Sequence, residues 1–333
     1  MLNFTLFLYD LFMKKEIYPF IISISVTFLL IFFYSILLYI PMRCNHIDNY
    51  VTIPKNATVN ITAKILDDNL CLNKILFKIA MKATFNEKNI KYGRYDFKSI
   101  NNMRDLISMI TSVNSDRIQV TIVEGRKIQD IALHFEQKMN MDVEKFLELC
   151  FDQSLINSLG LRGINSLEGY LYPDTYKFLK TYTESDVIKI MVNQFKYNYD
   201  QYVNNKTALS MEEVVVLGSI IQGEAMYSDE MNKISSVYHN RLKKNMLLQA
   251  DPTIQYILPK KKKRILVKDT KIKNPYNTYI NKGLPPGPIN NPGIDALVAA
   301  ANPLTTDYLY FVADKKGRHI FNKTFKAHLR SKK

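Results

Sequence analysis

The stretch Ser210-Met-Glu-Glu-Val-Val-Val-Leu-Gly-Ser-Ile-Ile-Gln-Gly-Glu224 predicts a buried helix that ends on a carboxylate. Ser210 and Glu213 have the spacing of a capping box, and an apolar run follows them. Leu217 and Ile221 share a helical face with Glu224, because seven residues make nearly two turns. We therefore expect Glu224 to lie among apolar neighbours, which would raise its pKa.

A carboxyl group that keeps its proton near neutral pH can act as a general acid toward a glycosidic oxygen. A glutamate at a helix end is more often solvated and idle, so the surrounding sequence decides. A second helix, predicted to begin after Ser228 as its N-cap, leads into loops rich in Gly and Pro. Such loops are rigid, and their amides, hydroxyls and phenols suit the recognition of a sugar polymer. They are residues 249–253, 276–279, 283–289 and 291–293.

Upstream, residues 17–40 are a stretch of 24 residues without a formal charge, which is long enough to span a bilayer. A cleavable signal peptide is the alternative, but no small-residue cleavage site follows Pro41. Lys14 and Lys15 precede the stretch, so we expect residues 1–16 in the cytoplasm and the rest of the chain outside. We assign no role to residues 1–13.

Between this anchor and the helix of Glu224, hydrophobic periodicity predicts two regions. Residues 50–115 read as a small β-α-α-β module followed by a helix. Residues 116–165 read as a connecting strand and helices. The expected strands are residues 51–53, 92–97 and 117–123, and the expected helices are residues 59–66, 72–81, 103–110, 128–139 and 143–151.

Composition excludes several classes of protein. The chain of 333 residues is 47% hydrophobic, which allows two or three folded domains. Its net charge of +14 includes the run Lys260–Arg264, but no nucleic-acid motif accompanies it, so we expect a solvated loop and no nucleic-acid partner. Attraction of this loop to anionic wall polymers or lipid head groups is the second interpretation.

Cysteine and histidine spacing gives no sign of a metal centre. Cys44, Cys71 and Cys150 lack ligand spacing, so we expect buried thiols, with a Cys71–Cys150 disulfide as the alternative. The five histidines form no metal motif and read as structural or cleft-edge residues. Neither a dinucleotide fingerprint nor a P-loop is present, so no cofactor is expected.

Taken together, these motifs resemble the YceG-like endolytic murein transglycosylases, the MltG family. The matching segments are residues 166–176, 218–224, 239–242, 249–253, 276–279, 283–287, 291–293, 308–314 and 319–328. The resemblance covers most of residues 50–330 and is strongest after residue 166. It implies an α+β fold with a single N-terminal transmembrane helix, a LysM-like module over residues 50–115 and a mixed α/β catalytic domain over residues 166–330.

The resemblance also implies an activity. The family cleaves MurNAc–GlcNAc bonds inside nascent glycan strands and leaves 1,6-anhydro-MurNAc ends, which helps to terminate glycan elongation. The implied setting is the inner membrane beside penicillin-binding synthases and the elongation machinery. Its catalytic glutamate aligns with Glu224. Our candidate substrate-binding residues are Glu168, Tyr170, Tyr172, Asn240, Gln249, Asp251, Thr253, Tyr276 and Asn277. Asn240 and Arg241 are also candidates for holding their helix against the loops, and a structural role in a turn or cap is the alternative for these polar residues.

Two departures from the family pattern leave alternatives open. The family usually has a second glutamate at the place of Gln222, and tryptophans at the places of Tyr170 and Tyr172. A scaffold that binds peptidoglycan without cleaving it would explain the change at residue 222. A true hydrolase of the muramidase type would need a second carboxylate, for which Asp251 is the candidate.

Overall fold

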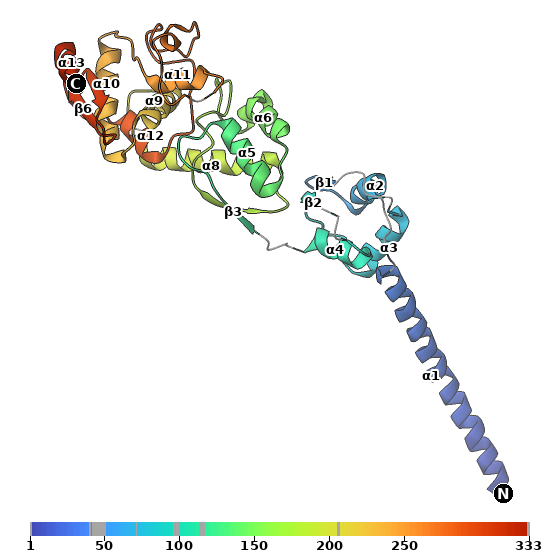
Figure 1. Ribbon diagram of the computed structural model, residues 1–333. Helices are drawn as coiled ribbons and strands as arrows, with labels where there is room; N and C mark the ends of the chain where they lie inside the picture. Colours follow the sequence, from blue (N-terminus) through green and yellow to red (C-terminus); the bar gives the residue numbers. More distant parts are fainter. Residues whose placement is uncertain are drawn as a thin grey trace. The chain divides into compact units, whose positions relative to one another are not determined.

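The computed structural model describes residues 2–39, 41, 51–70, 72–95, 97, 100–112, 117–204, 207–260 and 262–331, with side chains from Pro19 onward. The chain forms two compact units (Figure 1). Unit 1 comprises Met1–Asp116 with Leu179–Thr181, and unit 2 comprises Arg117–Phe178 with Tyr182–Lys333.

Unit 1 begins with a long apolar helix, α1 (Leu2–Tyr39). It starts earlier than the predicted Ile17, and its part Pro19–Tyr39 is long and apolar enough to cross a membrane. Most of the large side chains of that part are exposed on the protein, as Phe28 at 70% illustrates. Near its end the environment changes, because Leu38 is only 5% exposed and belongs to the hydrophobic core of the unit.

The rest of unit 1 has the predicted β-α-α-β order followed by a helix. Its elements are β1 (Val51–Ile53), α2 (Val59–Leu70), α3 (Lys74–Ala83), β2 (Gly93–Tyr95) and α4 (Met103–Thr111). The two strands pair antiparallel, with Val51 opposite Tyr95 and Ile53 opposite Gly93. Asn73 accepts hydrogen bonds from the first turn of α3, so this helix starts at Lys74 and not at the predicted Leu72.

Unit 2 is mainly helical, with small two-stranded sheets. Its elements are β3 (Arg117–Thr121), α5 (Ile128–Met139), α6 (Val143–Phe151), α7 (Gln153–Ser158), β4 (Thr175–Leu179), α8 (Glu184–Tyr202), α9 (Met211–Glu224), η1 (Ser228–Glu230), α10 (Met231–Lys243), α11 (Asp251–Ile257), η2 (Asp269–Lys271), α12 (Ile294–Ala301), β5 (Tyr310–Ala313), β6 (His319–Asn322) and α13 (Phe325–Ser331). The predicted helices α5 and α6 are confirmed. Residues 116–165, predicted as a connection, contribute to the same hydrophobic core as α8, α9 and α12.

The predicted capping box of α9 is confirmed, because Ser210 and Glu213 exchange hydrogen bonds with each other's backbone. Residues 214–221 of this helix are all buried. Helix α12 packs along α9 at Gly218, where a Cβ atom would lie 3.2 Å from Leu297. The helix that carries Glu224 is therefore fixed on several sides by the core of unit 2.

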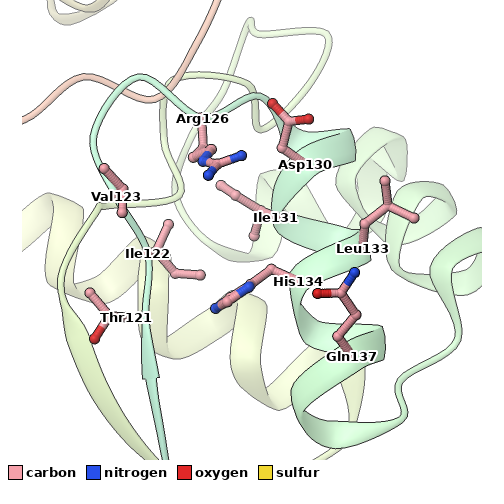
Figure 2. A pocket seen from close by; sticks show the side chains of 9 residues that line it. All are labelled: Thr121, Ile122, Val123, Arg126, Asp130, Ile131, Leu133, His134 and Gln137. Carbon is pink, nitrogen blue, oxygen red and sulfur yellow. The ribbon is translucent and has the colours of Figure 1, made fainter.

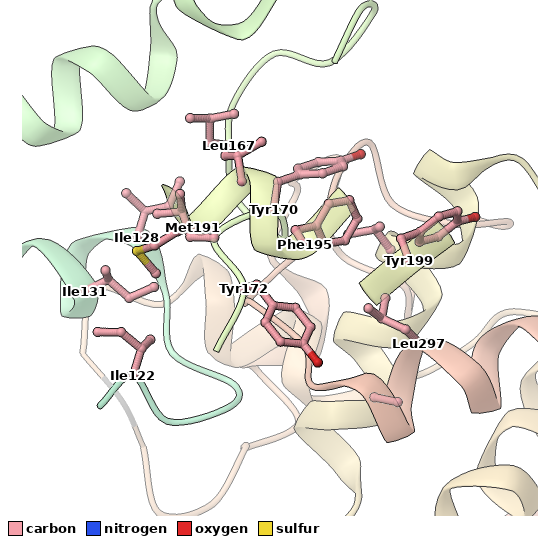
Figure 3. Packing of buried hydrophobic residues seen from close by; sticks show 14 of the residues in the cluster. Ile122, Ile128, Ile131, Leu167, Tyr170, Tyr172, Met191, Phe195, Tyr199 and Leu297 are labelled. Carbon is pink, nitrogen blue, oxygen red and sulfur yellow. The ribbon is translucent and has the colours of Figure 1, made fainter. Parts of the chain in front are cut away.

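The segment of residues 166–176 is more buried than its polar and aromatic character suggests. Tyr170 is 1% exposed and its ring packs edge-on against Phe195, with centroids 5.1 Å apart (Figure 3). Gly169, at a φ of +88°, brings the backbone against Val215 and Pro288, where a Cβ atom would clash. This segment therefore holds α8 and α9 together.

Three local predictions have a different outcome. Ser228 opens the 3-10 turn η1 and does not cap α10, which has Glu230 at its N-cap position instead. Cys150 is a free buried thiol, whereas Cys44 and Cys71 lie outside the described residues. In the basic run, Lys262 forms an ion pair of 2.7 Å with the buried Asp269, so part of the run is held in place.

Candidate active site

Glu224 lies at the end of α9, on the wall of a cleft of about 460 Å³. The cleft combines the end of α9 with a loop, a β-hairpin and the C-terminal helix of unit 2. Its lining residues are Glu224, Arg241, Leu248, Gln249, Asp251, Tyr279, Tyr310, Phe311, Val312, Ala313, His319, Phe325 and His328. Aromatic rings and a few charged groups thus surround one carboxyl group that sits at the edge of the core.

The charged form of Glu224 is disfavoured, as the sequence predicts. Burial raises its pKa to about 7, and the charge of Asp251 acts in the same direction. The hydroxyl of Tyr238 donates a hydrogen bond of 2.9 Å to Glu224 Oε1, which lowers the pKa but does not cancel burial. A carboxyl group with this pKa is present in both protonation states near neutral pH, so it can donate a proton and take one back.

Asp251, the first residue of α11, lies in the same cleft. Gly223 lets the start of α11 approach the end of α9 closely, because a Cβ atom at residue 223 would lie 2.7 Å from Pro252. Asp251 is exposed, and the hydroxyl of Tyr279 donates a hydrogen bond of 2.5 Å to its Oδ1. The cleft therefore contains two carboxylates in different surroundings, one at the edge of the core and one open to solvent.

Residues 249–253 are held in place by Thr278 of the segment 276–279. The Thr278 carbonyl accepts a hydrogen bond from the Gln249 amide, and the Thr278 hydroxyl accepts one from the Ala250 amide and contacts the Thr253 hydroxyl at 2.9 Å. Gln249 adopts a φ of 49°, which is uncommon for a residue with a side chain. Because its neighbours fix this backbone, the exposed Gln249 side chain lines the cleft.

Other predicted site residues hold the frame of the cleft. Asn277 is fully buried and donates to the carbonyls of Thr270 and Ile272, at 3.0 and 2.7 Å. Asn240 donates to the carbonyls of Thr306 and Tyr308. Neither residue lines the cleft, and Thr253 is also buried away from it.

Arg241 lines the cleft and also holds α10 against the chain around it. Its Nε donates to the Leu309 carbonyl and its Nη1 to the Leu248 carbonyl, each at 2.7 Å. Its guanidinium group lies 5.3 Å from the ring centroid of Tyr310. The prediction that Asn240 and Arg241 hold their helix against the loops is confirmed by the contacts of both residues.

Glu168, Tyr170, Tyr172 and Tyr276 do not line the cleft of Glu224. Glu168 is 3% exposed and accepts hydrogen bonds from the Ile128 amide and the Asn291 side chain, at 3.2 and 3.0 Å. Burial raises its pKa to about 8. Tyr172 is 7% exposed, so neither it nor Tyr170 offers an open ring face to a sugar, which corrects our interpretation of these two residues.

Tyr276 packs against Tyr256 with the two rings tilted, and their centroids lie 4.9 Å apart. Its hydroxyl also lies close to Gly287, where a Cβ atom would be 2.9 Å away. These contacts join the loop of residues 283–289 to α11. Tyr276 therefore helps to support the structure around the cleft.

Gln222 lies on another side of α9 from Glu224. Its Oε1 accepts a hydrogen bond of 2.9 Å from the Gly293 amide. Nearby, Asn290 donates to the Ser219 carbonyl, and the Ile289 amide donates to the Ser219 hydroxyl. These bonds fix residues 289–293 against α9, so Gln222 has a clear structural role.

Sequence reasoning did not name Tyr238, Tyr279 or Tyr310 as site residues. The Tyr238 hydroxyl donates a hydrogen bond to Glu224, and Tyr279 and Tyr310 line the cleft. His319 and His328 line the cleft, which confirms the prediction of cleft-edge histidines for these two residues, and His319 Nδ1 lies 2.9 Å from a carboxylate oxygen of Glu230. No pattern in the sequence indicated the contact of Tyr238 with Glu224.

A second, smaller cavity of about 270 Å³ lies between the end of β3 and α5 (Figure 2). Arg126, Asp130 and His134 line it beside Ile122 and Ile131. The pKa of His134 is lowered by burial first and then by nearby cations. Its polar groups are open to solvent, whereas burial raises the pKa of the Glu224 carboxyl group in the larger cleft.

Comparison with known proteins agrees with this geometry. The model of the YceG-like family matches residues 51–333. A Bacillus subtilis protein named endolytic murein transglycosylase is 34% identical over 302 residues, which are 85% of this chain and 83% of that protein. A Streptococcus pneumoniae protein of the same name is 28% identical over 310 residues, which are 83% of this chain and 56% of that longer protein.

A solved structure also matches. The crystal structure of a YceG-like protein from Listeria monocytogenes has a TM-score of 0.60 and 31% sequence identity to this chain. The match covers 85% of this chain and 98% of the Listeria chain. The family model, the sequence relatives and this structure lead to one conclusion: the chain belongs to the YceG-like family.

Proposed function

We propose that this protein is an endolytic murein transglycosylase that cleaves MurNAc–GlcNAc bonds within peptidoglycan strands and leaves 1,6-anhydro-MurNAc ends. The observation that carries the proposal is the Glu224 carboxyl group, whose pKa of about 7 and bond to Tyr238 suit a group that exchanges a proton at neutral pH. The names of the sequence relatives support the same activity.

The reaction needs one acid that later acts as a base. Glu224 gives its proton to the glycosidic oxygen while the bond from that oxygen to C1 of MurNAc breaks. The 6-hydroxyl oxygen of the same MurNAc residue then bonds to C1, and the Glu224 carboxylate takes the hydroxyl proton. Because the nucleophile belongs to the reacting sugar, its attack avoids most of the entropic cost of binding a water molecule.

Among the cleft residues, Gln249, Asp251 and Arg241 are the polar groups that we propose contact the glycan strand. Gln249 and Asp251 are exposed on a loop that Thr278 fixes, so their positions are set before a substrate binds. Phe311 and Phe325 line the same cleft and can contact the apolar face of a sugar ring.

A true hydrolase is the second candidate, and Asp251 is the observation that favours it. It is a carboxylate in the same cleft as Glu224, and hydrolases of glycosidic bonds use two such groups. However, Asp251 is open to solvent, and its Oδ1 accepts a hydrogen bond from the Tyr279 hydroxyl. We therefore assign Asp251 to binding and to the electrostatics of Glu224.

We also propose that α1 anchors the protein as a single membrane span, with unit 2 outside the cytoplasm. The length and exposure of Pro19–Tyr39 support the span, and Lys14 and Lys15 before it support the orientation. Action on nascent strands, proximity to penicillin-binding synthases and a place in the elongation machinery follow from the family resemblance.

The β-α-α-β module of unit 1 is proposed as a LysM-like glycan-binding unit. A cavity of about 610 Å³ lies where β1 leads into α2 and where α3 leads into β2. Tyr92 lines it, and Lys55 lies over the Tyr92 ring at 4.7 Å. An exposed ring beside amide side chains such as Asn56 and Asn60 suits a sugar polymer.

The test is mass spectrometry of purified peptidoglycan after incubation with the full chain in detergent, beside the Glu224→Gln variant. New internal 1,6-anhydro-MurNAc ends from the native protein alone are the expected result. Reducing MurNAc ends would show hydrolysis and overturn the transglycosylase assignment. Binding without cleavage by the native protein would favour the scaffold interpretation, and equal cleavage by the variant would remove Glu224 from the mechanism.

A further inference from the structure

Helix α3 has an apolar surface on the side that faces away from the core of unit 1. Phe77, Ala80 and Met81 are fully buried, so they define the inner face. On the outer face, Ile75, Leu76 and Ile79 are 62%, 41% and 49% exposed. A short helix in water normally carries polar residues on its solvent-facing side, so this apolar outer face indicates a binding surface.

The charge of α3 indicates the chemistry of that partner. The helix Lys74–Ala83 contains Lys74, Lys78 and Lys82 and no acidic residue. Lys74 lies 3.6 Å from Asp67 of the preceding helix, whereas Lys78 and Lys82 sit beside the apolar stripe at helical spacing. Apolar residues flanked by lysines are typical of a surface that lies on anionic lipid.

The end of α1 is part of the same unit. Leu38 belongs to the core that Phe77 also fills, and α1 packs against α3 and α4. Arg104 of α4 donates a hydrogen bond to the Tyr39 hydroxyl and lies over its ring. The unit is therefore in direct contact with the last turn of the apolar helix, where that helix would leave a bilayer (Figure 1).

Topology places the start of α3 at the end of the unit opposite its cavity of about 610 Å³, and α1 packs against α3. This cavity, proposed above to bind glycan and here called the sugar cavity, is lined by residues that follow Ile53 of β1 and by residues that follow α3. Helix α3 runs toward that cavity, so Ile75 and Leu76 in its first turn lie at the opposite end. The first turn of α3 and the cavity thus lie at different ends of one small unit.

We propose that the outer face of α3 lies on the anionic phospholipid surface next to the membrane span, with Ile75, Leu76 and Ile79 at the boundary between head groups and acyl chains. Lys78 and Lys82 contact lipid phosphates. The inference rests on the proposed membrane anchoring. Because α1 tethers the unit at a high effective concentration, a small contact is enough for stable docking. Docking holds the sugar cavity away from the bilayer and toward the wall.

The chain contains no tryptophan, which allows a direct test. The full-length Ile79→Trp variant is reconstituted into vesicles of anionic phospholipid with brominated acyl chains, which quench nearby tryptophan fluorescence. The control is the full-length Tyr92→Trp variant, because Tyr92 is also exposed but lies at the sugar cavity. We expect at least about twofold quenching at residue 79 and little at residue 92, as an interfacial depth of 5–10 Å for residue 79 requires.

Flotation of the same vesicles separates the two proposals. If the protein does not float with the lipid, the proposed anchoring fails, and this inference fails with it. If the protein floats but the tryptophan at position 79 is no more quenched than that at position 92, the anchoring holds and the docking of α3 is refuted. A Leu76→Trp variant repeats the measurement at a second position of the outer face.

Charge dependence gives an independent check. In the Lys78→Glu, Lys82→Glu variant that also carries Ile79→Trp, we expect the quenching to fall toward the control, because two contacts with lipid phosphate become repulsive. Exchange of the anionic lipid for a zwitterionic one should reduce quenching in the same way. Unchanged quenching in both experiments would contradict the assigned role of the lysines and overturn the proposal.

Discussion

The Glu224→Gln variant tests the physical state of the carboxyl group and its chemical role together. In the folded protein the pKa of Glu224 is about 7, above its ordinary value of 4.5, because the group is buried. The native protein therefore binds more protons than the unfolded chain between pH 4.5 and about 7. The stabilising contribution of Glu224 to the free energy of unfolding is therefore fully present below pH 4.5 and is lost as the pH rises through about 7.

The magnitude follows from the two pKa values. One pKa unit corresponds to about 1.4 kcal/mol, so the change from 4.5 to about 7 corresponds to about 3 kcal/mol. Glutamine is uncharged at every pH and its carbonyl can still accept the bond from Tyr238. Above pH 8 we therefore expect Glu224→Gln to be more stable than the native protein by up to about 3 kcal/mol, or about 6–12 °C in the Tm of a domain of this size.

The assay is thermal unfolding of the full chain in detergent from pH 4 to pH 9, followed by peptidoglycan cleavage at neutral pH. The matched control is Glu148→Gln, because Glu148 is an exposed glutamate of α6 in the same unit. We expect the control to keep both the native pH dependence and the native activity. If Glu224→Gln is no more stable than the native protein above pH 8, the Glu224 carboxyl group is solvated. If Glu224→Gln still cleaves peptidoglycan, Glu224 is not the general acid.

Further substitutions test the neighbours of this group. Tyr238→Phe removes a hydrogen bond that lowers the pKa of Glu224, so the pH profile of cleavage should shift upward, with a loss of activity of about tenfold at neutral pH. Asp251→Asn removes a charge that raises the pKa of Glu224, so the profile should shift downward while mass spectrometry still finds 1,6-anhydro ends. Burial raises the pKa of Glu168 to about 8, so the contribution of this group to the free energy of unfolding is lost as the pH rises from 4.5 to about 8. Glu168→Gln should remove this contribution to the pH dependence of thermal unfolding and should leave cleavage within about twofold. Gln222→Glu should leave cleavage within about threefold, since a carboxylate can also accept the Gly293 bond; a loss of activity beyond that range would contradict a purely structural role for this side chain.

Local sequence was enough to predict the helix of Glu224 and the state of its carboxyl group. The capping box fixes the start of α9, and the buried Leu217 and Ile221 fix the face on which Glu224 lies. The βααβ order of unit 1 also follows from periodicity over short segments. In each of these cases, the interactions that decide the structure join residues that are close in the chain.

The rest of the site depends on contacts between distant segments. The Tyr238 hydroxyl reaches Glu224 only because α10 folds back beside α9, and Tyr279 reaches Asp251 because Thr278 holds the two loops together. The aromatic residues of β5, β6 and α13 enter the cleft through the same tertiary arrangement. Periodicity identifies such elements one at a time, but it carries no information about which side chains meet.

Tyr170 and Tyr172, which we predicted to bind substrate, show a second limit of prediction from sequence. Residues 166–176 contain Gly, Pro, hydroxyl and acidic residues, a composition typical of an exposed binding loop. Gly169 nevertheless presses the backbone against Val215 and Pro288, which leaves Tyr170 and Tyr172 in the core. Large aromatic residues stabilise a core as well as a binding surface, so the residue types alone did not separate these two roles.

The glutamine at residue 222, where the family usually has a glutamate, is weak evidence for an inactive scaffold. The side chain of Gln222 contributes an oxygen atom that holds Gly293, and an amide supplies this oxygen as well as a carboxylate does. Glu124 also lies against Gly293, where a Cβ atom would be 2.0 Å from its Oε1. A glutamate at residue 222 would therefore place a second negative charge beside Glu124, whereas glutamine keeps the hydrogen bond without that repulsion. The pKa of Glu224 is shifted by burial, Tyr238, Asp251 and Arg241, and residue 222 is not among these causes, so the raised pKa does not depend on a carboxylate at residue 222.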